Sequence, residues 1–256
     1  MSLKIASWNV NSLRVRLPHL LTWLTQQQPD MVALQELKME DKDFPIAEIS
    51  QAGYHAVFNG QKTYNGVALL SKQPLEKIEK AFPDFMDEQR RVLAANLADV
   101  RIINLYVPNG ASVGSDKYEY KLRWLKQLRD YLKAQLLLYP KLIVLGDFNI
   151  APEDRDVHDS KAWQGNVLVS EPERIALRDV IADGFIDSFR LFEQGIGHYT
   201  WWDYRLNAFK RDLGLRIDHI LISHALQSSC TACYIDKTPR TWERPSDHAP
   251  ILAQFN

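Results

Sequence analysis

Strand-like segments recur along the whole chain, and their spacing constrains the fold more than any other feature. Several follow one another with too few residues between them for a crossover helix, which predicts antiparallel pairing. The segments are rich in β-branched and other apolar residues and end in polar or turn-forming residues. They are Leu3–Val10, Met31–Gln35, His55–Phe58, Gly66–Ser71, Arg91–Asn96, Arg101–Tyr106, Leu142–Gly146, Ile217–Ser223, Cys230–Ile235 and Ile251–Phe255.

Helical periodicity separates some of these strands. Apolar residues recur every three or four positions in Lys117–Leu138, which predicts a long helix. Ser170 and Glu173 have the spacing of a capping box at the start of another helix. Because no Gly/Ser-rich or Pro-rich linker interrupts the chain, we expect one domain over residues 1–256, α/β (α+β) in class, with two stacked sheets and helices outside. The shorter helices are predicted at Arg14–Gln27, Ile46–Gln51 and Glu173–Ala182.

Composition excludes several classes of protein. The chain has 256 residues, 46% of them hydrophobic and 25% charged, with a net charge of −1. These values exclude a disordered chain and a globally basic nucleic-acid binder. No apolar run approaches the roughly 18 residues of a membrane span, and the first residues lack the apolar core of a secretion signal, so we expect a cytoplasmic protein. Cys230 and Cys233 fall in a predicted strand, which places their thiols on opposite faces, and we interpret them as reduced structural thiols.

Local charge is uneven in spite of the small total. Residues 36–48 hold five acids against two lysines, and residues 147–159 hold five acids against one arginine. Residues 205–216 reverse the balance, with four bases against one acid. Any single cluster is explained by a solvent-exposed charged face. Together, the clusters are compatible with an acidic surface that attracts cations (a floor) beside a basic surface that attracts anions (a rim).

One motif suggests a serine hydrolase. Residues 110–114 read GASVG and so match the nucleophile-elbow pattern, with Asp218 and His248 following in the appropriate order. The elbow requires a sharp turn between a strand and a helix, whereas Pro108 and Asn109 already end the strand and the helix begins well beyond Ser112. We therefore interpret the segment as a Gly-containing loop.

Polar residues at the ends of four predicted strands point to different chemistry. Asp147 and Asn149 are two residues apart after a buried strand, Asn9 and Asn11 repeat this spacing, Glu36 ends a third strand, and Asp247 and His248 precede the last one. Each alone is typical of a turn. Together they suit an oxygen-preferring cation such as Mg²⁺ or Mn²⁺. Such an ion with an aspartate and a histidine is typical of phosphoester hydrolysis.

Seven ordered motifs resemble those of exonuclease III-type abasic-site endonucleases, in the endonuclease/exonuclease/phosphatase superfamily. The resemblance runs from residue 3 to the C-terminus and implies a four-layer α/β sandwich of two mixed sheets flanked by helices. The motifs are WNVNSLR from Trp8, LQELK from Leu34, YNGV from Tyr64, YVPN from Tyr106, GDFNI from Gly146, LRID from Leu215 and SDHAPI from Ser246.

The resemblance also assigns site residues. It implies that Glu36 is the principal Mg²⁺ ligand, that Asp147 activates water and protonates the leaving group, and that Asp218 orients His248 against the scissile phosphate. Tyr106 would lie near the leaving oxygen. The implied metal site comprises Asn9, Glu36, Asp147, Asn149, Asp247 and His248, and the implied catalytic set comprises Tyr106, Asp147, Asn149, Asp218, Asp247 and His248.

Contacts to DNA are implied in the same way. Tyr64 resembles a groove-inserting residue, and residues 199–205 resemble a loop that reaches into damaged DNA. The sequence departs from the family pattern at two places in the pocket expected for an abasic sugar. Leu215 stands where several family members have tryptophan, and residues 166–169 have bulkier side chains than the loop that often borders this pocket in the family. The implied substrate-binding residues are Tyr64, Asn109, Leu168, Arg174, Trp201, Tyr204, Arg205 and Arg216, with Lys210 and Arg211 as further candidates for backbone contacts.

We therefore predict a monomeric, Mg²⁺-dependent DNA repair nuclease. It would cleave duplex DNA 5′ to abasic sites and process 3′ ends as an exonuclease, phosphodiesterase and phosphatase. Three alternatives are a related phosphoesterase acting mainly on blocked 3′ ends or on non-nucleic-acid phosphoesters, a serine hydrolase using Ser112, and an inactive DNA-binding module.

Overall fold

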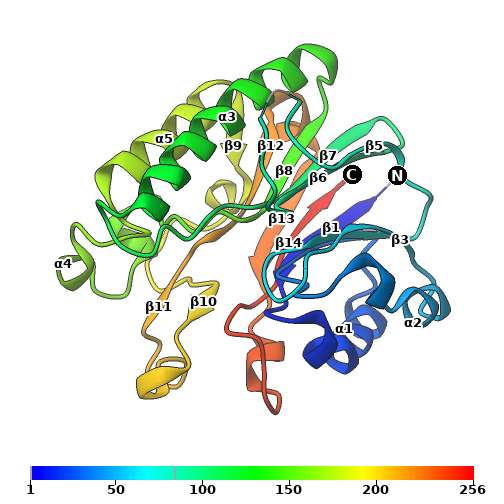
Figure 1. Ribbon diagram of the computed structural model, residues 1–256, viewed down its shortest axis with the longest axis horizontal. Helices are drawn as coiled ribbons and strands as arrows, with labels where there is room; N and C mark the ends of the chain where they lie inside the picture. Colours follow the sequence, from blue (N-terminus) through cyan, green and yellow to red (C-terminus); the bar gives the residue numbers. More distant parts are fainter. Residues whose placement is uncertain (1, 84) are drawn as a thin grey trace.

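Two six-stranded sheets stacked face to face form the centre of the molecule (Figure 1). The computed structural model describes residues 2–83 and 85–256. The first sheet has the order β13-β14-β1-β2-β4-β3, from Cys230–Ile235, Ile251–Phe255, Leu3–Asn9, Met31–Gln35, Val67–Ser71 and His55–Asn59. The second has the order β5-β6-β7-β8-β12-β9, from Glu76–Glu79, Val92–Leu97, Val100–Tyr106, Leu142–Asp147, Asp218–Ser223 and Phe185–Asp187.

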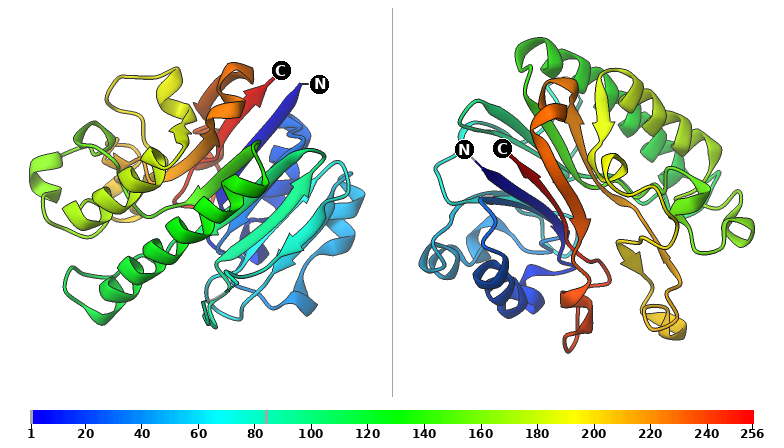
Figure 2. Two further views of the ribbon diagram at one scale, coloured as in Figure 1. Left: turned by 90° about the horizontal axis from the view of Figure 1, so that it is seen from above. Right: turned by 180° about the vertical axis from the view of Figure 1, so that it is seen from behind.

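Helices cover the outer face of each sheet. Figures 1 and 2 show α1 and α2 on the first sheet and α3 and α5 on the second. A two-stranded ribbon, β10 (Trp201–Trp202) with β11 (Gly214–Leu215), projects from one edge. The α-helices are α1 (Leu13–Gln27), α2 (Ile46–Gln51), α3 (Asp116–Leu138), α4 (Ser160–Trp163) and α5 (Glu171–Ala182), and 3₁₀ turns lie at Asp41–Asp43, Asp154–Asp156, Ser188–Leu191, Arg205–Asn207, His224–Ser229 and Thr238–Thr241.

Three apolar layers hold the four structural layers together. Ile5, Leu69 and Ile102 belong to the layer between the two sheets. A second layer packs α3 and α5 on the second sheet, and a third packs α1 and α2 on the first. The predicted four-layer α/β sandwich is therefore confirmed.

The topology brings the polar strand ends to one edge. β1 and β2 are parallel and joined by α1, and β7 and β8 are parallel and joined by α3. The carboxyl ends of β1, β2 and β8 carry Asn9, Glu36 and Asp147. Because β12 runs antiparallel to β8, its first residue, Asp218, lies opposite Asp147. β14 runs antiparallel to β1, so the segment just before it, with His248, reaches the same edge.

The sequence-based prediction for the two cysteines was wrong in one respect. The pairing of β13 with β14 shifts register between Cys230 and Ala232, which marks a β-bulge. An extra residue in a strand reverses the alternation of side chains beyond it. Cys230 and Cys233 consequently share one face and are both buried, as free thiols, in the layer between the sheets. In the described residues, no helix combines the length and apolar character needed to cross a membrane.

Candidate active site

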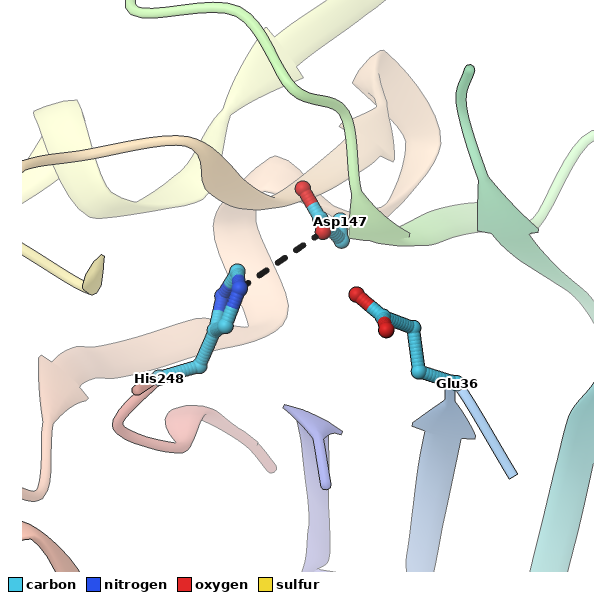
Figure 3. Close-up of side chains that lie close together, drawn as sticks. All are labelled: Glu36, Asp147 and His248. Carbon is cyan, nitrogen blue, oxygen red and sulfur yellow. Dashed lines mark ion pairs between the residues drawn. The ribbon is translucent and has the colours of Figure 1, made fainter. Parts of the chain in front are cut away.

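Glu36, Asp147 and His248 point toward one another at the shared edge of the two sheets (Figure 3). One potential ligand atom from each lies within 4.8 Å of the others. Asp147 and His248 are almost fully buried, with His248 Nε2 3.8 Å from Asp147 Oδ2. Among the described residues, this trio is the group of acidic and histidine side chains close enough to share a metal ion.

Asn9 links the two carboxylates. Its Nδ2 donates to Glu36 Oε1 and to Asp147 Oδ2, each at 2.9 Å. The backbone N–H of Asn11 donates to Asn9 Oδ1 at 2.9 Å, which fixes the orientation of the amide. The amide nitrogen therefore faces the carboxylates and the oxygen faces away. This arrangement supports the predicted role of Asn9 in orienting the site, and its role as a metal ligand stays a prediction.

The strand ends that carry these groups have unusual backbone conformations. Glu36 has a φ of 54° and Asn149 a φ of 51°, in the left-handed region that non-glycine residues rarely adopt. Backbone hydrogen bonds from Ser12 N–H to the Glu36 carbonyl (2.8 Å) and from Leu37 N–H to the Gly66 carbonyl (3.1 Å) hold the first of these turns. Such local strain persists only where the surrounding structure enforces it, and it is common at functional sites.

His248 is paired with a buried carboxylate. Its Nδ1 lies 2.9 Å from Asp218 Oδ2, and the Asp218 backbone N–H donates to Thr200 Oγ1 at 3.0 Å. Burial by itself lowers the pKa of His248, but the negative charges of Asp218 and Asp147 outweigh burial and raise it to about 10. The two carboxylates thus favour the imidazolium form, and His248 Nε2 faces Asp147.

For the pKa of Asp147, burial outweighs the attraction of the neighbouring charge, which is the opposite of the situation at His248. Burial raises the pKa of its carboxyl group to about 7, against the attraction of His248. The backbone N–H of Asn149 donates to its Oδ1 at 2.9 Å, so Asp147 is held from both sides. With a pKa near neutrality, this carboxylate is suited to taking and returning a proton.

Tyr106 and two asparagines lie beside the carboxylates of the site. Burial and the charges of Glu36 and Asp147 raise the pKa of Tyr106 well above its ordinary value, so the phenol remains a hydrogen-bond donor. Asn109 Nδ2 donates to Asn149 Oδ1 at 3.1 Å, and Asn149 Nδ2 donates to the Val107 carbonyl at 3.0 Å. Each amide nitrogen has a second hydrogen beyond these bonds.

The donor set fits a hard divalent cation only in part. The carboxylates of Glu36 and Asp147 supply the oxygen ligands that Mg²⁺ and Mn²⁺ prefer. His248 is paired through Nδ1 with Asp218, and its role as a metal ligand stays a prediction. Asn149 is likewise engaged through both amide atoms. Lys38 Nζ lies 2.8 Å from Glu36 Oε2, so one oxygen of this carboxylate already faces a cation.

Asp247 belongs to a neighbouring group. Its Oδ1 accepts from Asn11 Nδ2 at 2.8 Å and its Oδ2 from Trp201 Nε1 at 3.0 Å. Arg16 Nη2 donates to the Tyr204 hydroxyl at 3.0 Å, and Tyr204 in turn donates to the Pro245 carbonyl at 2.8 Å. Asp247 thus ties the β10–β11 ribbon to the site. It lies outside the trio of Glu36, Asp147 and His248, and its role as a metal ligand stays a prediction.

Two predicted DNA contacts border this edge and are accessible. Tyr64 is 68% exposed, and its loop is joined to the Glu36 segment by the hydrogen bond from Lys38 N–H to the Asn65 carbonyl at 3.0 Å. Arg205 is exposed on the β10–β11 ribbon and pairs with Asp203. Both remain predictions as DNA contacts.

Arg174 and Leu168 are less accessible. Arg174 donates to the Ala151 carbonyl and to Asp154, and only 15% of its side chain is exposed. Leu168 is buried, with a φ of 74°. It packs in an apolar cluster with Leu215 and Ile217, against which Trp201 is partly buried.

The prediction of Arg216 as a DNA contact is wrong. Its side chain is 1% exposed and forms ion pairs with Asp156 (2.6 Å) and Asp187 (2.8 Å). Because the guanidinium is enclosed by these two carboxylates, it cannot reach a phosphate on the surface. Ser112 lies in an exposed loop and not at a strand-to-helix turn, in agreement with our interpretation of the GASVG segment.

Sequence reasoning did not assign five residues that build the site. Asn11 and Lys38 lie inside two of the matched motifs, so their spacing from Asn9 and Glu36 could have identified them. The other three, Arg16, Thr200 and Ser246, connect segments far apart in the chain. Thr200 and Ser246 lie in segments that carry the resemblance, but no local pattern indicates what their side chains contact, such as the Asn9 carbonyl that accepts from Ser246 Oγ.

Fold and site together define a hydrolase that acts on phosphoesters. A four-layer sandwich brings two carboxylates, a histidine and asparagine amides together at one edge. The chain belongs to the Endonuclease/Exonuclease/phosphatase family, whose sequence model matches residues 6–248.

Individual relatives narrow the class. Exodeoxyribonuclease III of Haemophilus influenzae is 37% identical, over 99% of this chain and 100% of that protein. A structure of the 3′ phosphatase NExo from Neisseria, bound to a product DNA hairpin, superposes with a TM-score of 0.97 at 42% identity, covering 99% of both chains. An AP endonuclease from Archaeoglobus fulgidus gives a TM-score of 0.94 at 39% identity, again over 99% of both chains. The family resemblance, the hydrolytic nuclease class and a role in DNA repair are thereby confirmed.

Proposed function

We propose that this protein is a Mg²⁺-dependent repair nuclease, with Mn²⁺ as a substitute, acting on double-stranded DNA. It cleaves the phosphodiester 5′ to abasic sites and processes damaged 3′ ends, with residues 1–256 as one catalytic domain. The observation that carries the proposal is the convergence of Glu36, Asp147 and the Asp218–His248 pair at one edge. The exodeoxyribonuclease, 3′ phosphatase and AP endonuclease relatives support the choice of DNA.

Glu36 and Asp147 would hold the cation, which when bound neutralises phosphate charge and favours ionisation of water. Asp147 accepts a proton from the attacking water and later returns one to the leaving oxygen. His248 donates a hydrogen bond from its Nε2–H to a phosphate oxygen, and its positive charge offsets the charge that develops there. Asn149 and Asn109 direct their second amide hydrogens toward the same phosphate.

The proposal is tested with Glu36→Gln and Asp147→Asn. Both should reduce Mg²⁺-dependent cleavage of an abasic duplex by about 10²-fold or more, because each removes a charge that the reaction uses. Glu40→Gln is a matched control, since Glu40 pairs at the surface with Lys42. Cleavage at wild-type rates by either site variant, or by wild type in excess chelator, would contradict the proposal.

A second candidate, preference for blocked 3′ ends over internal abasic sites, is favoured by Leu168. Its side chain, with Leu215 and Ile217, occupies an apolar cluster beside Trp201. The resemblance implies that the pocket for an extruded sugar would lie here. A filled pocket disfavours an internal abasic site, which needs extrusion, more than a terminal phosphate.

The two substrates are compared by turnover of an abasic duplex and a 3′-phosphate duplex in one buffer. Leu168→Gly should shift the ratio toward the abasic duplex by about tenfold, because glycine keeps the φ of 74° and removes the side chain. Leu206→Gly, which has a similar φ of 57° but is exposed, is the control. An unchanged ratio in Leu168→Gly counts against this preference.

We also propose that the protein acts as a monomer in the cytoplasm. The buried free thiols of Cys230 and Cys233 are compatible with a reducing compartment. Analytical ultracentrifugation with and without duplex DNA tests the oligomeric state: a mass of one chain supports the monomer and a mass of two chains contradicts it.

A further inference from the structure

Lys121, on α3, carries an ammonium group but has no exposed surface. Its Nζ donates to the backbone carbonyls of Asn109 (3.1 Å) and Asn149 (2.7 Å) and to the carboxylate of Glu173. A lysine ammonium has three hydrogens, so these three contacts use all of them. One buried cation thus joins the segments that follow β7 and β8 to the start of α5.

Glu173 extends the connection to the loop beside the site. Its Oε1 accepts from the Leu168 N–H at 3.1 Å, and its Oε2 accepts from the Ser170 N–H at 3.1 Å and from the Ser170 hydroxyl. It also has no exposed surface. The pair therefore contacts the backbone of the loop that contains Leu168 as well as that of both asparagines.

The chain is shaped to lie against this lysine. Gly110, which follows Asn109, has a φ of 95°, and a Cβ there would lie 3.1 Å from Lys121 Cδ. A larger residue would be both strained and crowded at that point. The backbone that carries Asn109 consequently rests directly on the lysine stem.

A role in holding α3 against α5 is not enough to explain the buried ion pair of Lys121 and Glu173. Arg129 already joins α3 to α5 through Asp179 (2.6 Å) and Asp183 (2.5 Å) near the surface. Moreover, a buried ion pair contributes little net stability compared with apolar residues of similar volume. The distinguishing property of Lys121 is the pair of carbonyls it contacts.

We propose that Lys121, supported by Glu173, is a positioning residue for the two phosphate-facing asparagines. By fixing the carbonyls of Asn109 and Asn149, the ammonium sets where their linked amides stand relative to the scissile phosphate. The turn at Asn149 has a φ of 51°, which asparagine adopts more readily than most residues, and the ammonium holds its carbonyl within that turn. The inference rests on the proposed function, since it requires both amides to contact the phosphate.

The test uses the full-length protein and a 3′-phosphate duplex in Mg²⁺, with kcat, KM and Tm measured for each variant. Lys121→Met keeps the aliphatic stem and removes the ammonium. Its kcat should fall about 10- to 100-fold with KM within about threefold, because displaced amides stabilise the transition state less. Arg129→Met removes a link between the same helices and should keep the wild-type kcat.

The double variant Lys121→Met/Glu173→Gln separates positioning from stability. Its Tm should exceed that of Lys121→Met, since no buried charge is left without a partner, while its kcat remains equally low. If kcat recovers together with Tm, or if Lys121→Met keeps wild-type kcat, the inference is wrong. If Lys121→Met does not fold, the kcat of the double variant is the test: a low value supports the inference and a wild-type value contradicts it. Wild type that neither releases phosphate nor cleaves an abasic duplex would instead refute the proposed function.

Discussion

Replacing Arg216 by methionine is expected to destabilise the fold and to leave DNA affinity unchanged. The side chain is 1% exposed, and its guanidinium is 2.6 Å from Asp156 and 2.8 Å from Asp187. Removing one partner of a buried ion pair costs about 3–5 kcal/mol, because the remaining charge stays out of water. At about 2–4 °C per kcal/mol for a chain near this size, Tm should fall by roughly 6–20 °C.

Two measurements distinguish this role from a phosphate contact. Urea unfolding gives the free energy of unfolding, and duplex DNA affinity is measured against salt concentration without divalent metal. Arg216→Met should keep the wild-type salt slope. Arg205→Met, whose side chain is 84% exposed in the wild type, should change stability by less than about 0.5 kcal/mol and reduce the slope by about 1. Wild-type stability together with a reduced slope in Arg216→Met would refute the reasoning.

Three further predictions concern single positions. Asp218→Asn should lower kcat about 10²-fold or more at unchanged fold, measured by single-turnover cleavage, because His248 loses the charge that keeps it an imidazolium. Burial by itself raises the pKa of Asp156, but neighbouring guanidiniums lower it below its ordinary value, so it stabilises the fold above about pH 4 and less on acidification. Urea unfolding at pH 7 and at about pH 3 should show that the free energy of unfolding falls less on acidification in Asp156→Asn than in wild type. Gly146→Ala should lower the free energy of unfolding by more than about 4 kcal/mol, because its Cβ would lie 1.9 Å from the Leu105 carbonyl oxygen, and wild-type melting would contradict this.

The longer elements could be predicted from sequence because their patterns are local. The periodicity of Lys117–Leu138 corresponds to α3, and the capping box of Ser170 and Glu173 is present at α5. The strands β5 and β9 and the ribbon β10–β11, two to four residues per strand, were not predicted. Such short strands form through pairing with distant segments, so their own residues carry almost no signal.

The site was predictable in its residue types and less so in its geometry. Strand-end spacing indicated that Asn9, Glu36 and Asp147 would meet, and they do. Which atom of Asn9 faces the carboxylates depends on the Asn11 backbone N–H, and this depends on a turn that no pattern reveals. The bulge at Cys230 likewise arises from the register with β14, so alternation along the strand gave the wrong face for Cys233.

Net charge illustrates the same difference between composition and placement. Residues 205–216 are rich in bases, but Arg216 is enclosed while Arg205, Lys210 and Arg211 are exposed on the β10–β11 ribbon. Asp247, through Trp201, ties this ribbon to the carboxylate edge. The acids of the site therefore lie beside the exposed bases and offset them in the total. A chain with a net charge of −1 can thus present a basic rim to DNA next to a cation-binding floor, because the interaction depends on local and not on summed charge.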